Sequence, residues 1–340
     1  MPFRSRFCSL VALGLALCAA QAEPSIPAGS SAFPYGREVI LLGPGGASRL
    51  AAWPGDARPR DAASFDGGFV AWERGSQAIL RWKGEGGLER LGRLEASQVF
   101  LSRDWALGKS ELFSDGSGFS FSIYRITSRL ERAASFQLDC FPSDCLFLGR
   151  RCYLAGADRA DRKNSLYEID LSTGMRRLLA ELPKSRDFGG LVSDGRTLWY
   201  FLSPAYPRKT EAFVLSFDLD PAGGASAPRR LELGGLEAGS LSWYGSGFAS
   251  GGRFWLPAAS GGGKATRVSL YAFDPAGGRA SAALPLATGL YAPLAQAGDS
   301  FYAIGFLYVR DPGAFSLLAI KTGAGRAAVT SAALPLGSSR

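Results

Sequence analysis

Apolar and polar residues alternate along this chain over short stretches that are separated by glycine-containing turns. In residues 165–182, "SLYEIDLSTGMRRLLAEL", an alternating run over 166–171 stops at a Ser-Thr-Gly turn, and a second run follows over 175–182. Alternation with a period of two residues on both sides of a short turn predicts a β-hairpin.

The same hairpin recurs along the chain. Copies of it occupy 38–53, 78–94, 121–138, 165–182, 213–233, 268–286 and 316–336. A second kind, with Gly or Asp in the turn and aromatic residues after it, lies between them at 65–72, 102–108, 148–156, 193–201, 250–257 and 297–305. A repeat of about 41 to 55 residues that carries four short strands is typical of a β-propeller blade.

The two kinds of hairpin have different expected places in a blade. The aromatic hairpin is expected to hold strands A and B near the propeller axis, and the other hairpin strands C and D near the rim. Aromatic side chains recur at similar phase on the inner hairpins, at Trp72, Trp105, Tyr153, Trp199, Trp255 and Tyr302. We expect them to pack between blades; the alternative is a ring of aromatics that stack on a ligand.

Two stretches carry a family resemblance. "SDGRTLWYF" (193–201) and "LYEIDLSTGMRRL" (166–178) resemble the repeats of bacterial exported β-propellers of the TolB-like or YVTN-like kind. The resemblance covers 38–337 and implies an all-β propeller of four-stranded antiparallel blades. Seven blades are favoured over six plus an N-terminal hairpin, and residues 23–36 can add an inner strand to the first blade. We expect one domain, 23–340, with repeats over about 37–337.

The first 22 residues predict a secretory signal peptide. A basic start is followed by an apolar run of about ten residues and by Ala20-Gln21-Ala22, which suits signal peptidase. The protein is therefore expected in the periplasm or outside the cell; the alternative is a lipid anchor on Cys18. No later apolar stretch is long enough to span a bilayer. We expect a monomer with no transmembrane segment.

Three cysteines remain after the signal: Cys140, Cys145 and Cys152. An oxidising compartment favours disulfides, and an odd number allows at most one bridge within the chain. Cys140 with Cys145 is the first choice. No metal site is predicted, because exported thiols tend to oxidise and no histidine can complete a ligand set.

Charge and composition narrow the function. The net charge of +8 falls to +6 without Arg4 and Arg6, and the excess arginines are scattered. Nucleic acid is not an expected partner. The positive charge indicates either a solvated basic surface or a surface that attracts anionic envelope polymers or lipid headgroups. The chain has no histidine, which excludes Ser-His-Asp and Cys-His nucleophile pairs. No nucleotide loop is present, and no cofactor is predicted.

Carboxylates are the remaining candidates for chemistry. Most acidic residues fall at strand ends or turns, where turn capping is expected: Asp66, Asp104, Asp170, Asp194, Asp218, Asp274 and Asp299. The loop "DRADRKN" (158–164) holds Asp158, Asp161 and Asn164, but its interleaved cations oppose calcium. A carboxylate-dependent hydrolase or lyase that acts on a sugar or lactone in the central channel is the alternative function. A quinone-holding redox propeller is a third.

Long B-to-C loops indicate where binding would occur. They occupy 108–118, 156–164, 203–210 and 257–266, on the face that B-to-C and D-to-A connections share. Function usually lies on such loops. We expect a non-catalytic propeller that binds an envelope protein or anionic polymer through this face. The expected contributors are Arg162, Lys163, Tyr206, Arg208, Lys209 and Lys264.

Overall fold

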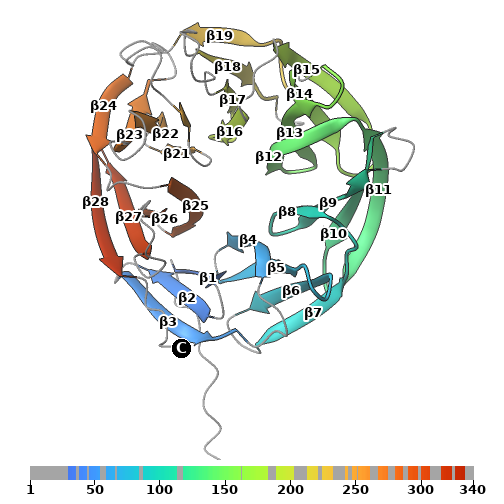
Figure 1. Ribbon diagram of the computed structural model, residues 1–340, viewed down its shortest axis with the longest axis horizontal. Helices are drawn as coiled ribbons and strands as arrows, with labels where there is room; N and C mark the ends of the chain where they lie inside the picture. The colour runs from blue at the N-terminus through green and yellow to red at the C-terminus, as the bar shows by residue number, and fades with distance from the viewer. Residues whose placement is uncertain are drawn as a thin grey trace, which may run out of the picture.

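The computed structural model is built from strands arranged in a ring (Figure 1). It describes residues 30–35, 38–43, 46–53, 59–65, 67–83, 87–112, 118–161, 163–182, 189–202, 213–220, 224–232, 242–243, 247–250, 252–260, 267–274, 280–285, 290–297, 300–306, 315–323 and 326–333. No helix long and apolar enough to cross a membrane occurs in these ranges.

The described strands form seven sheets. The first three sheets are β1 (Ser31–Tyr35), β2 (Glu38–Gly43) and β3 (Gly46–Ala52); β4 (Pro59–Phe65), β5 (Gly68–Glu73), β6 (Ala78–Lys83) and β7 (Leu88–Arg93); and β8 (Gln98–Leu101), β9 (Trp105–Leu112), β10 (Phe119–Ile126) and β11 (Leu130–Leu138). The next two are β12 (Cys140–Leu148), β13 (Arg151–Asp158), β14 (Asn164–Asp170) and β15 (Arg176–Leu182); and β16 (Gly189–Ser193), β17 (Thr197–Leu202), β18 (Phe213–Asp218) and β19 (Arg229–Glu232). The last two are β20 (Ser242–Trp243), β21 (Phe248–Ser250), β22 (Arg253–Ser260), β23 (Arg267–Phe273) and β24 (Ala280–Pro285); and β25 (Leu290–Ala297), β26 (Ser300–Phe306), β27 (Phe315–Gly323) and β28 (Arg326–Ala333).

Each four-stranded sheet is an antiparallel meander of consecutive strands. Strands β4, β8, β12, β16 and β25 lie toward the centre of the ring, and β7, β11, β15, β19 and β28 lie at its rim (Figure 1). The predicted β-propeller architecture is confirmed, with the aromatic hairpins inside and the other hairpins outside.

The first sheet differs from the others because it has three described strands. Its inner strand, β1, comes from the segment that was expected to supply one. The sheet of β20 to β24 has five strands, with β20 and β21 both paired to β22. The number of complete blades remains a prediction.

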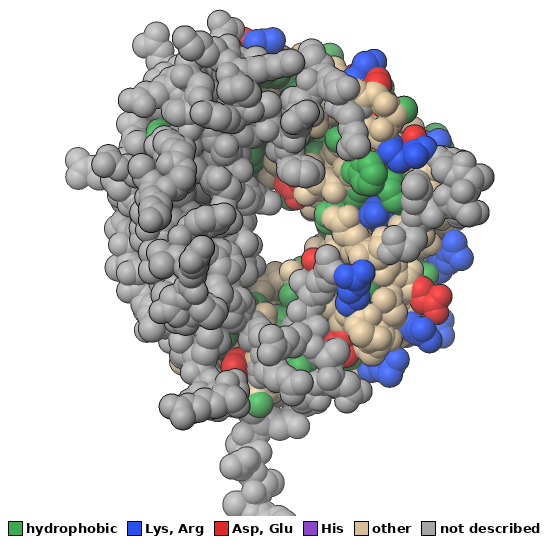
Figure 2. Space-filling model, viewed as in Figure 1, with side chains coloured by type: hydrophobic (Ala, Val, Ile, Leu, Met, Phe, Trp, Pro, Cys, Tyr) green, Lys and Arg blue, Asp and Glu red, His purple; other side chains and the backbone are tan. Residues whose placement is uncertain are grey.

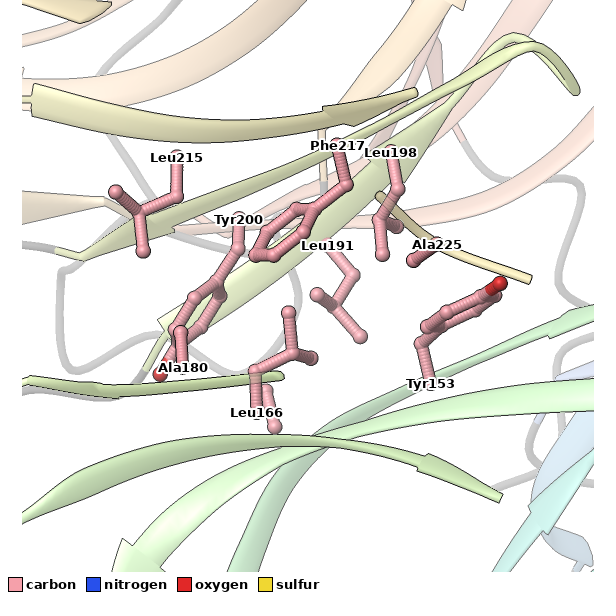
Figure 3. Packing of buried hydrophobic residues seen from close by; sticks show 10 residues of the cluster. Tyr153, Leu166, Ala180, Leu191, Leu198, Tyr200, Leu215, Phe217 and Ala225 are labelled. Atoms are coloured by element: carbon pink, nitrogen blue, oxygen red, sulfur yellow. The ribbon is translucent and has the colours of Figure 1, made fainter. Parts of the chain in front are cut away.

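The hydrophobic core lies between neighbouring sheets. One cluster joins the sheet of β12 to β15 to that of β16 to β19, where Tyr153 and Leu166 face Leu191, Tyr200 and other apolar side chains (Figure 3). Similar clusters join the other neighbouring sheets from β1 to β24. A sheet covered on both faces needs apolar residues on both, so its inner strands read as continuous apolar runs. Strand β5 is accordingly buried throughout, whereas β7 at the rim has one buried residue, Leu91.

The inner aromatic residues pack as expected. Trp72, Tyr153, Trp199 and Trp255 are at most 2% exposed, and Trp105 packs against the cluster between the sheets of β8 to β11 and β12 to β15. These residues belong to the core. The side chain of Tyr302 lies outside the described part of the structure.

The predicted turn at 172–174 is formed as well. Gly174 has a φ of +74°, which favours glycine, and it lies against the neighbouring sheet. A Cβ atom at Gly174 would stand 3.0 Å from the carbonyl oxygen of Ser135. The turn sequence therefore serves the contact between sheets as well as the hairpin.

Candidate functional site

Of the six residues expected to contribute to the loop-rich face, the structure describes Lys163. Lys163 lies between β13 and β14, and its Nζ donates to Glu181 Oε1 at 2.7 Å and lies 3.2 Å from Asp161 Oδ2. Hydrogen bonds to Glu181 and then Asp161 raise the pKa of Lys163. Its charge is thus already matched by two acids. Arg162, Tyr206, Arg208, Lys209 and Lys264 lie outside the described residues.

The expected sharing of one face by B-to-C and D-to-A connections holds in this sheet. Arg159, in the loop between β13 and β14, donates through Nε to Asp139 Oδ1 at 2.7 Å. Asp139 lies in the connection from β11 to β12, and the Arg159 amide also donates to its carbonyl. The two kinds of connection are therefore in direct contact.

Of the acidic residues expected to cap turns, Asp170 and Asp194 do so. The side chains of Asp104 and Asp218 instead pair with Arg103 and Arg229. In the loop 158–164, Asp158 Oδ1 accepts from the amides of Ala160 and Asp161. Asp170 accepts from Ser172 and Thr173, and hydrogen bonds, chiefly from the Ser172 hydroxyl, lower its pKa. These carboxylates stabilise turns.

One inner-strand carboxylate joins two sheets. Asp144 follows a β-bulge at Pro142 on β12, where proline has no amide to offer the ladder. Its Oδ2 accepts from the Leu191 amide of β16 at 2.9 Å, and its Oδ1 from the Cys145 amide. Asp144 lies on an inner strand, where a carboxylate-dependent hydrolase or lyase would need acidic residues near the central channel. Both of its carboxylate oxygens, however, accept hydrogen bonds from backbone amides.

A buried carboxylate lies between the sheet of β12 to β15 and the next. The Glu168 side chain is 5% exposed and pairs with Arg151 at 3.3 Å and Arg177 at 3.0 Å. Its Oε2 also accepts from the Ala225 amide at 2.8 Å, and Arg177 donates to the Ala225 carbonyl. Ala225 lies between β18 and β19, so this network fastens two sheets together.

A buried cation has the equivalent place in the sheet of β4 to β7. Arg81 pairs with Glu89 at 2.8 Å and donates to the carbonyl of Thr127, which lies between β10 and β11. Arg81 and Glu168 hold the same position in the repeats "ILRW" and "LYEI", each opposite a residue of reversed charge on the outer strand. That repeated position could have revealed both residues, which the sequence reasoning missed.

Exposed arginines recur on the outermost strands. Arg90, Arg132 and Arg230 lie opposite Leu80, Tyr124 and Leu215, which hold one position of the repeat. We call these three arginines the rim row. Arg90 and Arg132 have no ion pair within the described part of the chain, whereas Arg230 pairs with Glu232. Lys and Arg side chains line the outer edge of the described half of the ring (Figure 2).

The sheet of β12 to β15 interrupts the rim row with an apolar residue. Leu178 holds the position opposite Tyr167 and is 50% exposed. Met175, just before β15, is 74% exposed. Single exposed apolar residues are common, so these two carry no conclusion by themselves.

The expected Cys140–Cys145 bridge is not formed. All three cysteines are free thiols, and both members of the expected pair lie on β12. Five residues along an extended strand span about 16 Å, whereas a disulfide needs Cα atoms within about 7 Å. The sequence suggested a loop at 141–144; the structure has a strand there.

Comparisons with known proteins support the fold alone. No family model and no curated protein matches the chain. Among solved β-propeller structures, Hsv2p of Kluyveromyces lactis is 11% identical, with a TM-score of 0.55 over 92% of this chain and 100% of that one. Hydrazine synthase of Kuenenia stuttgartiensis is 14% identical, with a TM-score of 0.51 over 85% of this chain and 90% of that one.

A prolyl endopeptidase is also similar. It is 14% identical, with a TM-score of 0.53, and the match covers 91% of this chain and half of that one. The similar structures thus include enzymes and other proteins on one fold. A shared propeller does not specify a function.

Proposed function

We propose that this protein is an exported, non-catalytic binding module whose partner is an anionic polymer of the cell envelope. The observation that carries the proposal is the rim row, because Arg90, Arg132 and Arg230 repeat at one register position on three outer strands. Regularly placed cations on a rigid ring suit a polymer that bears regularly placed anions.

The buried charges support a binding role over the hydrolase alternative. Asp144 and Glu168 accept from backbone amides, and Glu168 also pairs with two arginines. Such carboxylates hold the scaffold. A general acid would instead need to face a substrate.

The loop-rich face is the second part of the proposal. Two described cations of this face, Arg159 and Lys163, are paired with acids, so contacts there would depend on Arg208, Lys209 and Lys264. Reversing these three charges and recovering the bound partners by pull-down tests that face. Unchanged partners would count against it.

The rim row can be tested with a matched pair of triple variants. Arg90→Glu, Arg132→Glu and Arg230→Glu change the row; Arg74→Glu, Arg103→Glu and Arg196→Glu change exposed arginines elsewhere by the same total charge. With immobilised poly-L-glutamate at low salt, we expect the row variant to bind about tenfold more weakly and the control to change less than about threefold.

Two results would refute the proposal. If the unaltered protein does not bind the polyanion, the partner class is wrong. If both triple variants weaken binding equally, total charge rather than the rim row is responsible. Raising the salt concentration should weaken binding of the unaltered protein, because salt screens exposed charges.

A further inference from the structure

Cys145 and Cys152 are neighbours on one face of the inner hairpin. Cys145 on β12 lies opposite Leu154, and Cys152 on β13 lies opposite Phe147, so the two cysteines are diagonal across the ladder. Residues two apart on a strand share a face. Both side chains contact the apolar cluster between this sheet and that of β8 to β11, and the pKa of Cys145 is raised by burial and then by the neighbouring Cys152 thiol.

Cys140 is placed differently. It begins β12, lies opposite Asp158 and is fully buried. Burial, and secondarily the charges of Asp158 and Asp139, raise the pKa of its thiol to about 12. Cys140 lies about 16 Å along β12 from Cys145, and its partner Asp158 is six residues from Cys152 on β13. Of the three cysteines, one is therefore set apart and two lie close together on one face of the hairpin.

We propose that Cys145 and Cys152 form an intrachain disulfide and that Cys140 stays reduced. Diagonal neighbours have Cα atoms about 7 to 8 Å apart, which is at the limit of disulfide geometry, so the two strands must approach slightly for the bridge to close. The proposal goes beyond the binding function and does not depend on it. It accounts for an odd number of cysteines in a protein expected to be exported.

The chemistry balances with a small-molecule disulfide such as oxidised glutathione. The Cys145 thiolate attacks it, forming a mixed disulfide and releasing one reduced glutathione. The Cys152 thiolate then attacks the Cys145 sulfur, the protein bridge forms, and the second glutathione leaves. Two protein thiols are oxidised, the glutathione disulfide is reduced, and the two protons lost from cysteine pass to the glutathione thiolates.

Timing follows from burial. The Cys152 side chain is fully buried in the folded protein, so a disulfide reagent does not reach it once the sheets have packed. We therefore expect the bridge to form during folding, before the hairpin of β12 and β13 is covered.

Peptide mapping distinguishes the three possible pairings. Residues 23–340, whose cysteines are Cys140, Cys145 and Cys152, are refolded with oxidised and reduced glutathione. Free thiols are then alkylated, and the protein is digested with trypsin and a protease that cleaves before Asp. The chain then yields 139–143, 144–150 and 152–157, each with one cysteine. We expect 144–150 linked to 152–157, with Cys140 alkylated.

Single-cysteine variants complete the test. Cys140→Ser should retain the linked peptides, and Cys145→Ser should leave Cys152 alkylated. A link from Cys140 to either other cysteine, or alkylation of all three in refolded protein, would overturn the proposal. Because the readout is a covalent link, it does not depend on any binding activity.

Discussion

The sheets of β4 to β7 and β12 to β15 each use a buried charged side chain to bind a turn of the next sheet, but the two charges have opposite signs. In the first, Arg81 reaches the carbonyl of Thr127 in the next sheet; in the second, Glu168 reaches the amide of Ala225. A carbonyl accepts a hydrogen bond and an amide donates one, so the neighbouring turn dictates the sign of the buried charge. The partner on the outer strand, Glu89 or Arg177, then follows.

Exchanging the charges of Arg81 and Glu89 should have the largest effect, because it removes the hydrogen bond from Arg81 to the Thr127 carbonyl. In the double variant Arg81→Glu and Glu89→Arg, the pair is kept but a carboxylate faces the Thr127 carbonyl. We expect the free energy of unfolding to fall by about 3 kcal/mol, because the buried carboxylate at position 81 cannot donate a hydrogen bond and is repelled by the Thr127 carbonyl oxygen. Urea unfolding at neutral pH measures the change.

An exposed pair supplies the control for that exchange. Arg129 and Glu131 form an ion pair 2.8 Å long, with side chains 77% and 42% exposed. The exchange Arg129→Glu and Glu131→Arg should change stability by less than about 0.5 kcal/mol. Equal losses in the two double variants would contradict the role given to the Thr127 carbonyl.

Removing only the charge of Glu168 should have the next largest effect. Glu168→Gln keeps the shape of the side chain but leaves Arg151 and Arg177 without their shared acid. We expect a loss of about 2 kcal/mol in the free energy of unfolding, measured by urea denaturation. Glu232→Gln, in a pair that is half exposed on both sides, should cost less than about 0.5 kcal/mol.

The smallest expected effect concerns pH and the turn after β14. The pKa of Asp170 is lowered below its ordinary 3.8 in the folded protein, so ionised Asp170 stabilises the fold above about pH 4, and this contribution is lost as the pH falls through the lowered pKa. Asp170→Asn should be less stable than the unaltered protein at pH 6, and the difference should shrink toward pH 2. A constant difference in urea midpoint would argue against this ionisation.

The sequence predicted the hairpins because their signals are local. Alternation over 166–171, the glycine turn and the second run became β14 and β15, and "SDGRTLWYF" became the end of β16 and most of β17. Burial of Trp72, Tyr153, Trp199 and Trp255 followed from the same pattern. Of the six residues predicted for the loop face, Lys163 is paired with acids. The other five lie outside the described residues and stay predictions.

The cysteines show the limit of local reasoning. Proline and aspartate between Cys140 and Cys145 favoured a loop, yet the bulge at Pro142 lets β12 continue past them as an inner strand. Which thiols meet is then set by the register with β13. Register depends on pairing across the sheet, which a short stretch of sequence does not reveal.

The sequence by itself determined the repeated hairpins, their inner and outer roles and the apolar character of the inner strands, because each depends on the alternation of neighbouring residues and on turn chemistry. Only the tertiary structure decided which charges are buried, which sign each has and which cysteines lie close together. The bonds that decide the buried charges join residues 46 and 57 positions apart, from Arg81 to Thr127 and from Ala225 to Glu168. They exist only because the sheets stack around a ring.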